Sequence, residues 1–253
     1  MIFEVCVDSV EGAVEAQAGG AQRVELCDNL VEGGTTPSLG MIQVVRQKIS
    51  IGLHVIIRPR GGDFLYSEAE FEVMRQDIQA AKAAGANGVV IGLLNQDGSI
   101  DLPRTRALVE LARPLSVTFH RAFDVSRDAQ ESLEALCSLG IERVLTSGQQ
   151  ASAFEGADCI ARLVRQAGDR ICILAGGGIT EANVAEIVRK TGVKEVHFSA
   201  RRWIESPMQS RNRRCVMGRA YEPDEYRRRV TDAGQVARVI QAAARGLAPV
   251  EAR

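Results

Sequence analysis

The chain has 253 residues, 45% of them hydrophobic and 25% charged, and its formal net charge is -1. This length suits one α/β barrel or two smaller domains, and the composition allows a sizeable core. A charge this close to zero gives no general attraction to nucleic acid or to an anionic membrane, so neither is expected as a partner. No apolar run approaches the roughly 18 residues that a membrane-spanning helix needs.

The N-terminus and the cysteines indicate a cytoplasmic protein. The first residues, Met-Ile-Phe-Glu-Val-Cys, read as a strand with no basic segment before it, so no signal peptide is expected. Without a secretory signal, thiols in a chain of this size are expected to stay reduced. The cysteines form no C-x-x-C pair and are Cys6, Cys27, Cys137, Cys159, Cys172 and Cys215.

Short runs of apolar and β-branched residues alternate with helical stretches along the chain. Eight such runs are predicted as strands, over residues 2–7, 23–27, 54–58, 88–93, 115–120, 143–147, 171–175 and 195–199. Alternation of this kind indicates a parallel sheet, and eight strands favour a closed TIM-type (β/α)8 barrel. An open doubly wound sheet should carry G-x-G-x-x-G after its first strand, and Asp-Ser-Val-Glu-Gly stands there instead, so no nucleotide cofactor is expected.

Helix boundary signals support this alternation. Helix starts are predicted at Thr36 before Pro37, Ser67 with Glu70, Pro103, Asp128 with Glu131, and Thr180. Helix ends are predicted at Gly20, Gly85, Gly140 and Gly192, where glycine relieves a left-handed backbone. No linker-like segment divides the chain, so a single barrel domain over residues 1–253 is expected. Its irregular, arginine-rich loop at residues 200–221 would precede a last helix from about Asp224 to Gly246.

The strand tips carry the candidate site, because active sites of such barrels lie at the C-terminal ends of the strands. In the first two strands Val5, Val7, Val24 and Leu26 form the face that packs on helices, so the alternate residues point inward. The predicted inward residues are Glu4, Cys6, Glu25, Cys27, Arg58, Thr118, His120, His197 and Ser199. Unpaired charges are costly to bury, so this concentration predicts a functional site. A buried Glu25–Arg58 ion pair that only fixes strand register is the alternative.

Two loops could hold an anion. Arg58 and Arg60 flank a proline and precede Gly61-Gly62, an arrangement suited to a carboxylate or phosphate, although a solvated turn is the alternative. Three glycines follow the seventh strand, where barrel enzymes commonly bind phosphate through backbone N–H groups. The remaining candidate ligand-binding residues are Arg121, Ser147, Gly176, Gly177 and Gly178.

Cys6 and Cys27 are predicted on neighbouring strands and could form a soft two-thiolate site for Cu(I). Zn²⁺ is less well served, because it normally takes three or four protein ligands. The alternative is that both thiols are small core fillers, since cysteine is among the most buried residue types.

The chain resembles the CutC family, named for copper homeostasis. The resemblance rests on residues 23–27, 32–38, 57–64, 118–124, 145–148 and 195–197. It implies a TIM-like barrel, a cytoplasmic homodimer and a link to copper, and it matches Cys6 and Cys27 to cysteines proposed as Cu(I) ligands in the family. Independently of this resemblance, the arginine-rich loop is interpreted as a basic surface or a dimer contact.

Two hypotheses follow, and the sequence does not decide whether the chain is an enzyme. In the first, the protein serves copper homeostasis and binds Cu(I) through Cys6 and Cys27. In the second, it is an enzyme of isomerase, epimerase or lyase type that acts on a small anionic or phosphorylated metabolite. There Glu25 or His120 would be the general base and His197 the acid or orienting group.

Overall fold

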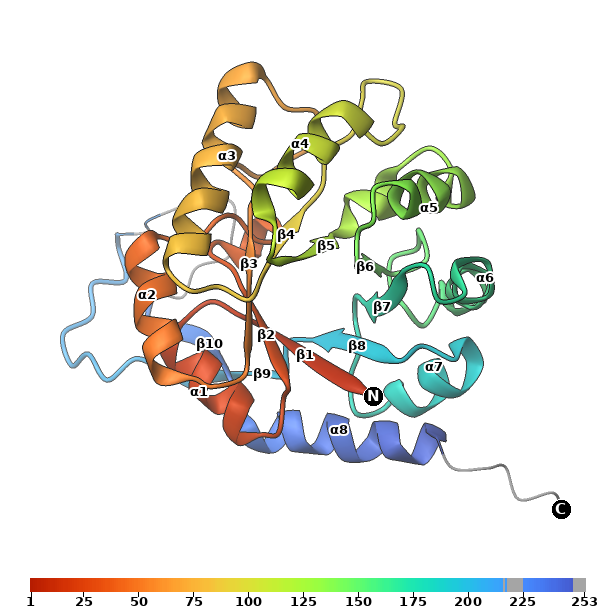
Figure 1. The fold of residues 1–253 in the computed structure, drawn as a ribbon. Helices are drawn as coiled ribbons and strands as arrows, with labels where there is room; N and C mark the ends of the chain where they lie inside the picture. The colour runs from red at the N-terminus through yellow and green to blue at the C-terminus, as the bar shows by residue number, and fades with distance from the viewer. Residues whose placement is uncertain (216, 218–224, 248–253) are drawn as a thin grey trace, which may run out of the picture.

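A computed structural model of the chain describes residues 1–215, 217 and 225–247 (Figure 1). Eight parallel strands form one closed barrel in chain order, and β8 pairs with β1. They are β1 (Ile2–Val7), β2 (Arg23–Leu26), β3 (Gly52–Ile56), β4 (Gly88–Ile91), β5 (Ser116–Phe119), β6 (Arg143–Thr146), β7 (Cys172–Gly176) and β8 (Glu195–Phe198). The predicted (β/α)8 barrel is therefore confirmed, and its strand ends lie within two residues of the predicted ones.

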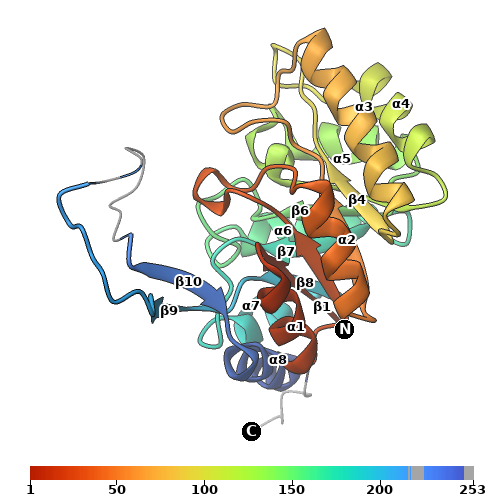
Figure 2. The same cartoon turned by 90° about the vertical axis from the view of Figure 1, so that its left-hand side faces the viewer.

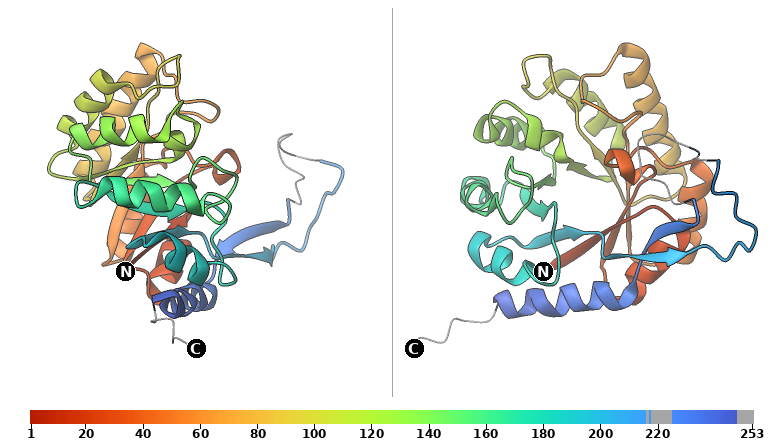
Figure 3. Two further views of the ribbon diagram at one scale, coloured as in Figure 1. Left: turned by 90° about the vertical axis from the view of Figure 1, so that its right-hand side faces the viewer. Right: turned by 180° about the vertical axis from the view of Figure 1, so that it is seen from behind.

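Helices surround the barrel, and the last of them lies against α1 and α7 (Figures 1 and 3). The α-helices are α1 (Val10–Ala18), α2 (Leu39–Lys48), α3 (Glu68–Ala83), α4 (Leu102–Ala112), α5 (Ala129–Ser138), α6 (Ala157–Ala167), α7 (Val184–Thr191) and α8 (Ala233–Leu247). Two short 3-10 helices, η1 (Leu30–Glu32) and η2 (Arg121–Val125), follow β2 and β5. Within the described residues, no helix is long and apolar enough to cross a membrane.

Most of the predicted helix boundaries are confirmed. Ser67 and Glu70 form a capping box, Asp128 caps α5, and Pro103 lies in the first turn of α4. The glycines predicted to end helices have positive φ angles, at Gly20, Gly85, Gly140 and Gly192.

Two predicted helix starts are wrong. Ser38, rather than Thr36, caps α2, because the Thr36 hydroxyl accepts a hydrogen bond from the Arg58 N–H and is held beside the end of β3. Helix α7 begins at Val184 rather than after Thr180. The Thr180 N–H donates to the side chain of Asn183, which forms a turn before the helix.

The segment at residues 200–221 is not wholly irregular. Strand β9 (Arg201–Glu205) pairs antiparallel with β10 (Arg227–Thr231), and this hairpin projects away from the barrel (Figure 2). The guanidinium groups of Arg227 and Arg229 each lie over the Trp203 ring, 5.0 and 4.9 Å from its centroid. These contacts between side chains of the two strands stabilise the hairpin. They could not be predicted from the arginine content of residues 200–221 alone, because the partner strand lies outside that segment. The last helix consequently begins at Ala233; Arg219 and Asp224 lie outside the described residues.

The main hydrophobic core lies between the barrel and its helices. Val5, Val7, Val24 and Leu26 are fully buried in it, as their alternation predicted. Inside the barrel, a small separate apolar cluster contains Cys6, Cys27, Ile56 and Val90. Barrel interiors are usually filled by branched apolar side chains. Here buried polar groups occupy much of that space, and they position the candidate site.

Candidate functional site

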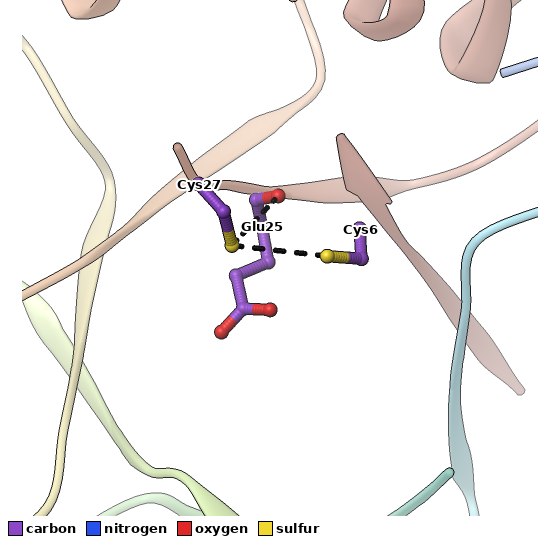
Figure 4. Close-up of side chains that lie close together, drawn as sticks. All are labelled: Cys6, Glu25 and Cys27. Carbon is purple, nitrogen blue, oxygen red and sulfur yellow. Dashed lines mark hydrogen bonds between the residues drawn. The ribbon is translucent and has the colours of Figure 1, made fainter. Parts of the chain in front are cut away.

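Two buried thiols lie side by side where β1 and β2 end (Figure 4). The Sγ atoms of Cys6 and Cys27 are 3.7 Å apart, and both cysteines are free. Cys6 belongs to β1 and pairs in register with Glu25 of β2, so Cys27 follows two residues further along the same inward face. A Glu25 carboxylate oxygen lies within 4.8 Å of both sulfur atoms. The predicted thiol pair is therefore close enough for both sulfur atoms to bind one ion.

His197 of β8 connects two carboxylates inside the barrel. Its Nδ1 lies 2.8 Å from Glu4 Oε1, and its Nε2 lies 3.7 Å from Glu25 Oε2. Burial alone would lower the pKa of His197, but hydrogen bonding to Cys6 and Glu4 and the nearby carboxylates raise it well above its usual value. The imidazole is thus stabilised as a cation between these groups.

The two thiols differ in acidity because they share one hydrogen bond. The hydrogen bond from Cys27, with a further contribution from His197, lowers the pKa of Cys6 to about 6 against the opposing effect of burial. The same hydrogen bond and burial raise the pKa of Cys27 well above its usual value. Burial raises the pKa of Glu25 to about 8. At neutral pH the site therefore offers one thiolate, one thiol and a largely protonated carboxyl group.

An ion-pair network crosses the barrel from β1 to β6. Arg23 donates to Glu4 and to Glu195, the latter at 2.5 Å, and Arg143 Nε lies 3.3 Å from the same Glu195 oxygen. His54 Nδ1 is 3.9 Å from Glu4 Oε2, and burial lowers its pKa to about 3, so this imidazole is neutral. Four residues of this network were not predicted from the sequence: Arg23, Arg143, Glu195 and His54. Arg23 lies two residues before Glu25, and Glu195 lies two residues before His197. The alternation that placed Glu25 and His197 inward therefore also places Arg23 and Glu195 inward.

A cavity of about 670 Å³ opens beside the thiols. Predicted site residues that line it are Cys6, Glu25, Arg58, His120, Arg121, Gly177, Gly178, His197 and Ser199. Others lie outside its lining and are Glu4, Cys27, Arg60, Thr118, Ser147 and Gly176. Its wall also contains Asp124, which the sequence analysis did not select although it follows His120 and Arg121 in one motif.

The two arginines predicted to hold an anion are engaged by their own loops. Arg58 is buried and donates to the backbone carbonyls of Glu32, Gly34 and Gly62 at 2.7, 2.7 and 2.8 Å. Its guanidinium therefore fixes the loops after β2 and β3, and no Glu25–Arg58 ion pair is found within the described residues. Arg60 pairs with Glu70 at 2.5 Å, away from the cavity.

Comparisons with known proteins place these residues in a family. Residues 1–202 match the sequence model of the CutC family. The human copper homeostasis protein cutC homolog is 51% identical over 246 residues, which cover 97% of this chain and 90% of that protein. A CutC family protein of Mesorhizobium japonicum is 52% identical, with 96% and 94% of the two chains covered. This chain belongs to the CutC family.

A solved CutC structure supports the same assignment. The CutC protein of Streptococcus agalactiae superposes with a TM-score of 0.75 at 36% identity, covering 79% of this chain and 98% of that one. Thiamine phosphate pyrophosphorylase from Pyrococcus furiosus has a TM-score of 0.61 at 17% identity over 98% and 97% of the two chains, and this likeness shows the fold alone. In this CutC-family chain, β10 and α8 lie beyond the residues matched by the family model.

Proposed function

We propose that this CutC-family protein binds Cu(I) through Cys6 and Cys27 and serves copper homeostasis. One observation carries the proposal: two free, buried thiols with sulfur atoms 3.7 Å apart at the strand tips of the barrel. The names of the human and mouse relatives, both copper homeostasis protein cutC homologs, agree with it.

The donor set fits a soft monovalent ion. Two metal–thiolate bonds of about 2.3 Å can span up to about 4.6 Å, so sulfur atoms 3.7 Å apart can share one ion. Thiolates select Cu(I) over hard cations, and the third group within reach is the carboxyl of Glu25. With Glu25 largely protonated, the site offers fewer charged ligands than a structural zinc site usually has. His197, which is held by its hydrogen bond to Glu4, would stabilise the Cys6 thiolate.

X-ray absorption at the copper K-edge tests the ligand assignment. The protein loaded with one equivalent of Cu(I) is expected to show sulfur scatterers as its main first shell, because two thiolates would supply the bonds. A Cys6→Ser variant should lose about half of that sulfur signal. A first shell made only of nitrogen and oxygen in the loaded wild-type protein would contradict the proposal.

The pH dependence of Cu(I) affinity provides a second test. Cys27 holds its proton throughout the neutral range, so binding should release one proton above pH 6 and two protons below it, where Cys6 is also protonated. The logarithm of the affinity should therefore rise with pH with a slope of about 2 below pH 6 and about 1 above it. Competition with a colorimetric Cu(I) chelator between pH 5 and pH 8 measures the slope. A pH-independent affinity would mean that thiols are not the ligands.

The acid–base enzyme hypothesis receives less support from the geometry. Arg58 and Arg60, its proposed anion-binding pair, are engaged by loop carbonyls and by Glu70. For the same CutC-family protein we propose a cytoplasmic location, consistent with its free cysteines, and a homodimeric state, which sedimentation equilibrium would test.

A further inference from the structure

The cavity lining includes His120, whose side chain is buried and carries a hydrogen-bond donor that has no acceptor within the described residues. His120 is 4% exposed, and its Nδ1 accepts a hydrogen bond from the Ala122 N–H at 3.1 Å, so Nε2 carries the proton. Within the described residues, His120 Nε2 has no hydrogen-bond partner. Burial, with the nearby charge of Arg58, lowers the pKa of His120 to about 3, so the ring is a neutral donor. A buried donor without a partner is unfavourable, which indicates that a molecule in the cavity accepts this bond.

A second group of donors lies on the loop after β7. Gly177 and Gly178 have φ angles of 103° and 70°, and both line the cavity with Ile179. Among the described residues, the backbone N–H groups of Gly178 and Ile179 have no acceptor. Successive N–H groups in such a turn form the kind of concavity that binds anions.

Arg121 adds a cation to this loop. A β-carbon at Gly177 would lie 3.4 Å from Arg121 Cζ and 3.5 Å from its Nη1, so the guanidinium lies against the glycine backbone. Arg121 uses Nε for Asp124, at 2.7 Å, and Nη2 for Ser147, at 2.8 Å. These two bonds fix the orientation of the guanidinium and leave Nη1 for a ligand.

The charges around the cavity favour an anion. Four arginines line it, Arg58, Arg121, Arg201 and Arg229, together with the acidic residues Glu25, Glu32 and Asp124. Asp124 is paired with Arg121, so the arginines outnumber the acidic residues that remain in the lining. A concave wall with excess positive charge attracts small anions.

We propose that this cavity binds a small organic anion, with its phosphate or carboxylate group held by Arg121 and the N–H groups of Gly178 and Ile179. A hydroxyl or carbonyl oxygen in the body of the same molecule accepts the hydrogen bond of His120 Nε2. The volume of about 670 Å³ lies in the range of small-molecule sites. The groups that would bind the anion are different from the proposed copper ligands, although Cys6 also lines the cavity.

Isothermal titration calorimetry tests the site with three probes: inorganic phosphate, glycerol 3-phosphate and glycerate. At least one probe is expected to bind with one site per chain, and preference for a phosphate or the carboxylate probe identifies the head group. Arg121→Gln should weaken every binding probe by about tenfold or more. Arg60→Gln is the matched control, since Arg60 also pairs with nearby carboxylates but lies outside the cavity, and should change affinity by less than about twofold.

Two further variants separate the parts of the proposal. His120→Phe should weaken glycerol 3-phosphate or glycerate about fivefold and leave inorganic phosphate nearly unchanged, because only the organic probes have a body for Nε2 to contact. The Cys27→Ser variant removes one proposed copper ligand that lies outside the cavity lining, so it should bind the anion as the wild type does, and failure of the copper proposal would leave this one standing.

If the Arg121→Gln variant does not fold, amide NMR of the wild-type protein tests whether the anion binds at the loop after β7. The resonances of Gly178 and Ile179 should shift on addition of the binding probe. The proposal is overturned if none of the three probes binds, if binding is indifferent to Arg121→Gln, or if those two amides do not respond.

Discussion

Replacing Arg23 with methionine should lower the free energy of unfolding by about 3–5 kcal/mol. Arg23 is buried and is the shared partner of Glu4 and Glu195, whose side chains are 1% and 11% exposed. Methionine fills much of the same volume but leaves both carboxylates in the barrel without this cation. Removing one member of a buried ion-pair network is strongly destabilising, because the charge left behind has no solvent to compensate it.

Urea unfolding of the two proteins measures this effect. The matched control is Arg170→Met, since Arg170 also makes two hydrogen bonds to one carboxylate, Glu134, but both side chains are about half exposed. That surface pair should contribute no more than about 1 kcal/mol. A loss below about 1 kcal/mol for Arg23→Met would show that the network does not stabilise the fold.

The loss in free energy of unfolding caused by Arg23→Met should also depend on pH. In the wild type burial opposes ionisation of Glu4, but His197 and Arg23 outweigh it and hold the pKa of Glu4 well below its usual value. Ionised Glu4 therefore stabilises the folded protein at pH values above the pKa of this carboxyl group in the unfolded chain. This stabilisation is lost as pH falls toward the lower pKa of the folded state. Without Arg23 the pKa of Glu4 rises, so ionisation of Glu4 stabilises the variant less than it stabilises the wild type. The difference between the two proteins should therefore be fully present above about pH 4 and shrink as pH falls below it.

The fold could be predicted from the sequence because its signals are local and repeat. Each strand run is short and apolar, and the helix between successive strands begins or ends at a recognisable residue such as Ser67 or Gly85. The β9–β10 hairpin was missed because its pairing joins residues 201–205 to residues 227–231. Cross-strand packing of Trp203 with Arg227 and Arg229 appears only once both segments are placed.

Site residues could be predicted where the alternation of side chains along a strand alone determines that they point into the barrel. Glu25, Cys27 and His197 were placed inward by alternation, and the structure brings the first two beside Cys6. Arg23 has the same parity as Glu25 but was not included among the predicted inward residues. The partners of Arg58 could not be inferred, because they are backbone carbonyls of two loops whose course depends on the tertiary structure.

Loss of copper binding on removal of both thiols is the largest effect expected. The Cys6→Ser/Cys27→Ser variant should bind Cu(I) at least about 100-fold more weakly than the wild type, because hydroxyl groups are hard, poorly ionised ligands. Neither substitution changes side-chain shape much, so far-UV circular dichroism and thermal unfolding should confirm that the barrel remains folded. Cys137→Ser/Cys159→Ser is the matched control, since these thiols lie half-buried on α5 and α6.

Competition for Cu(I) against a colorimetric chelator, carried out on these three proteins under anaerobic conditions, tests the copper proposal most directly. The wild type and the Cys137→Ser/Cys159→Ser control should each bind about one Cu(I) per chain with equal affinity, while the Cys6→Ser/Cys27→Ser variant fails to compete. Equal binding by all three proteins, or no binding by the wild type, would contradict a copper site at Cys6 and Cys27.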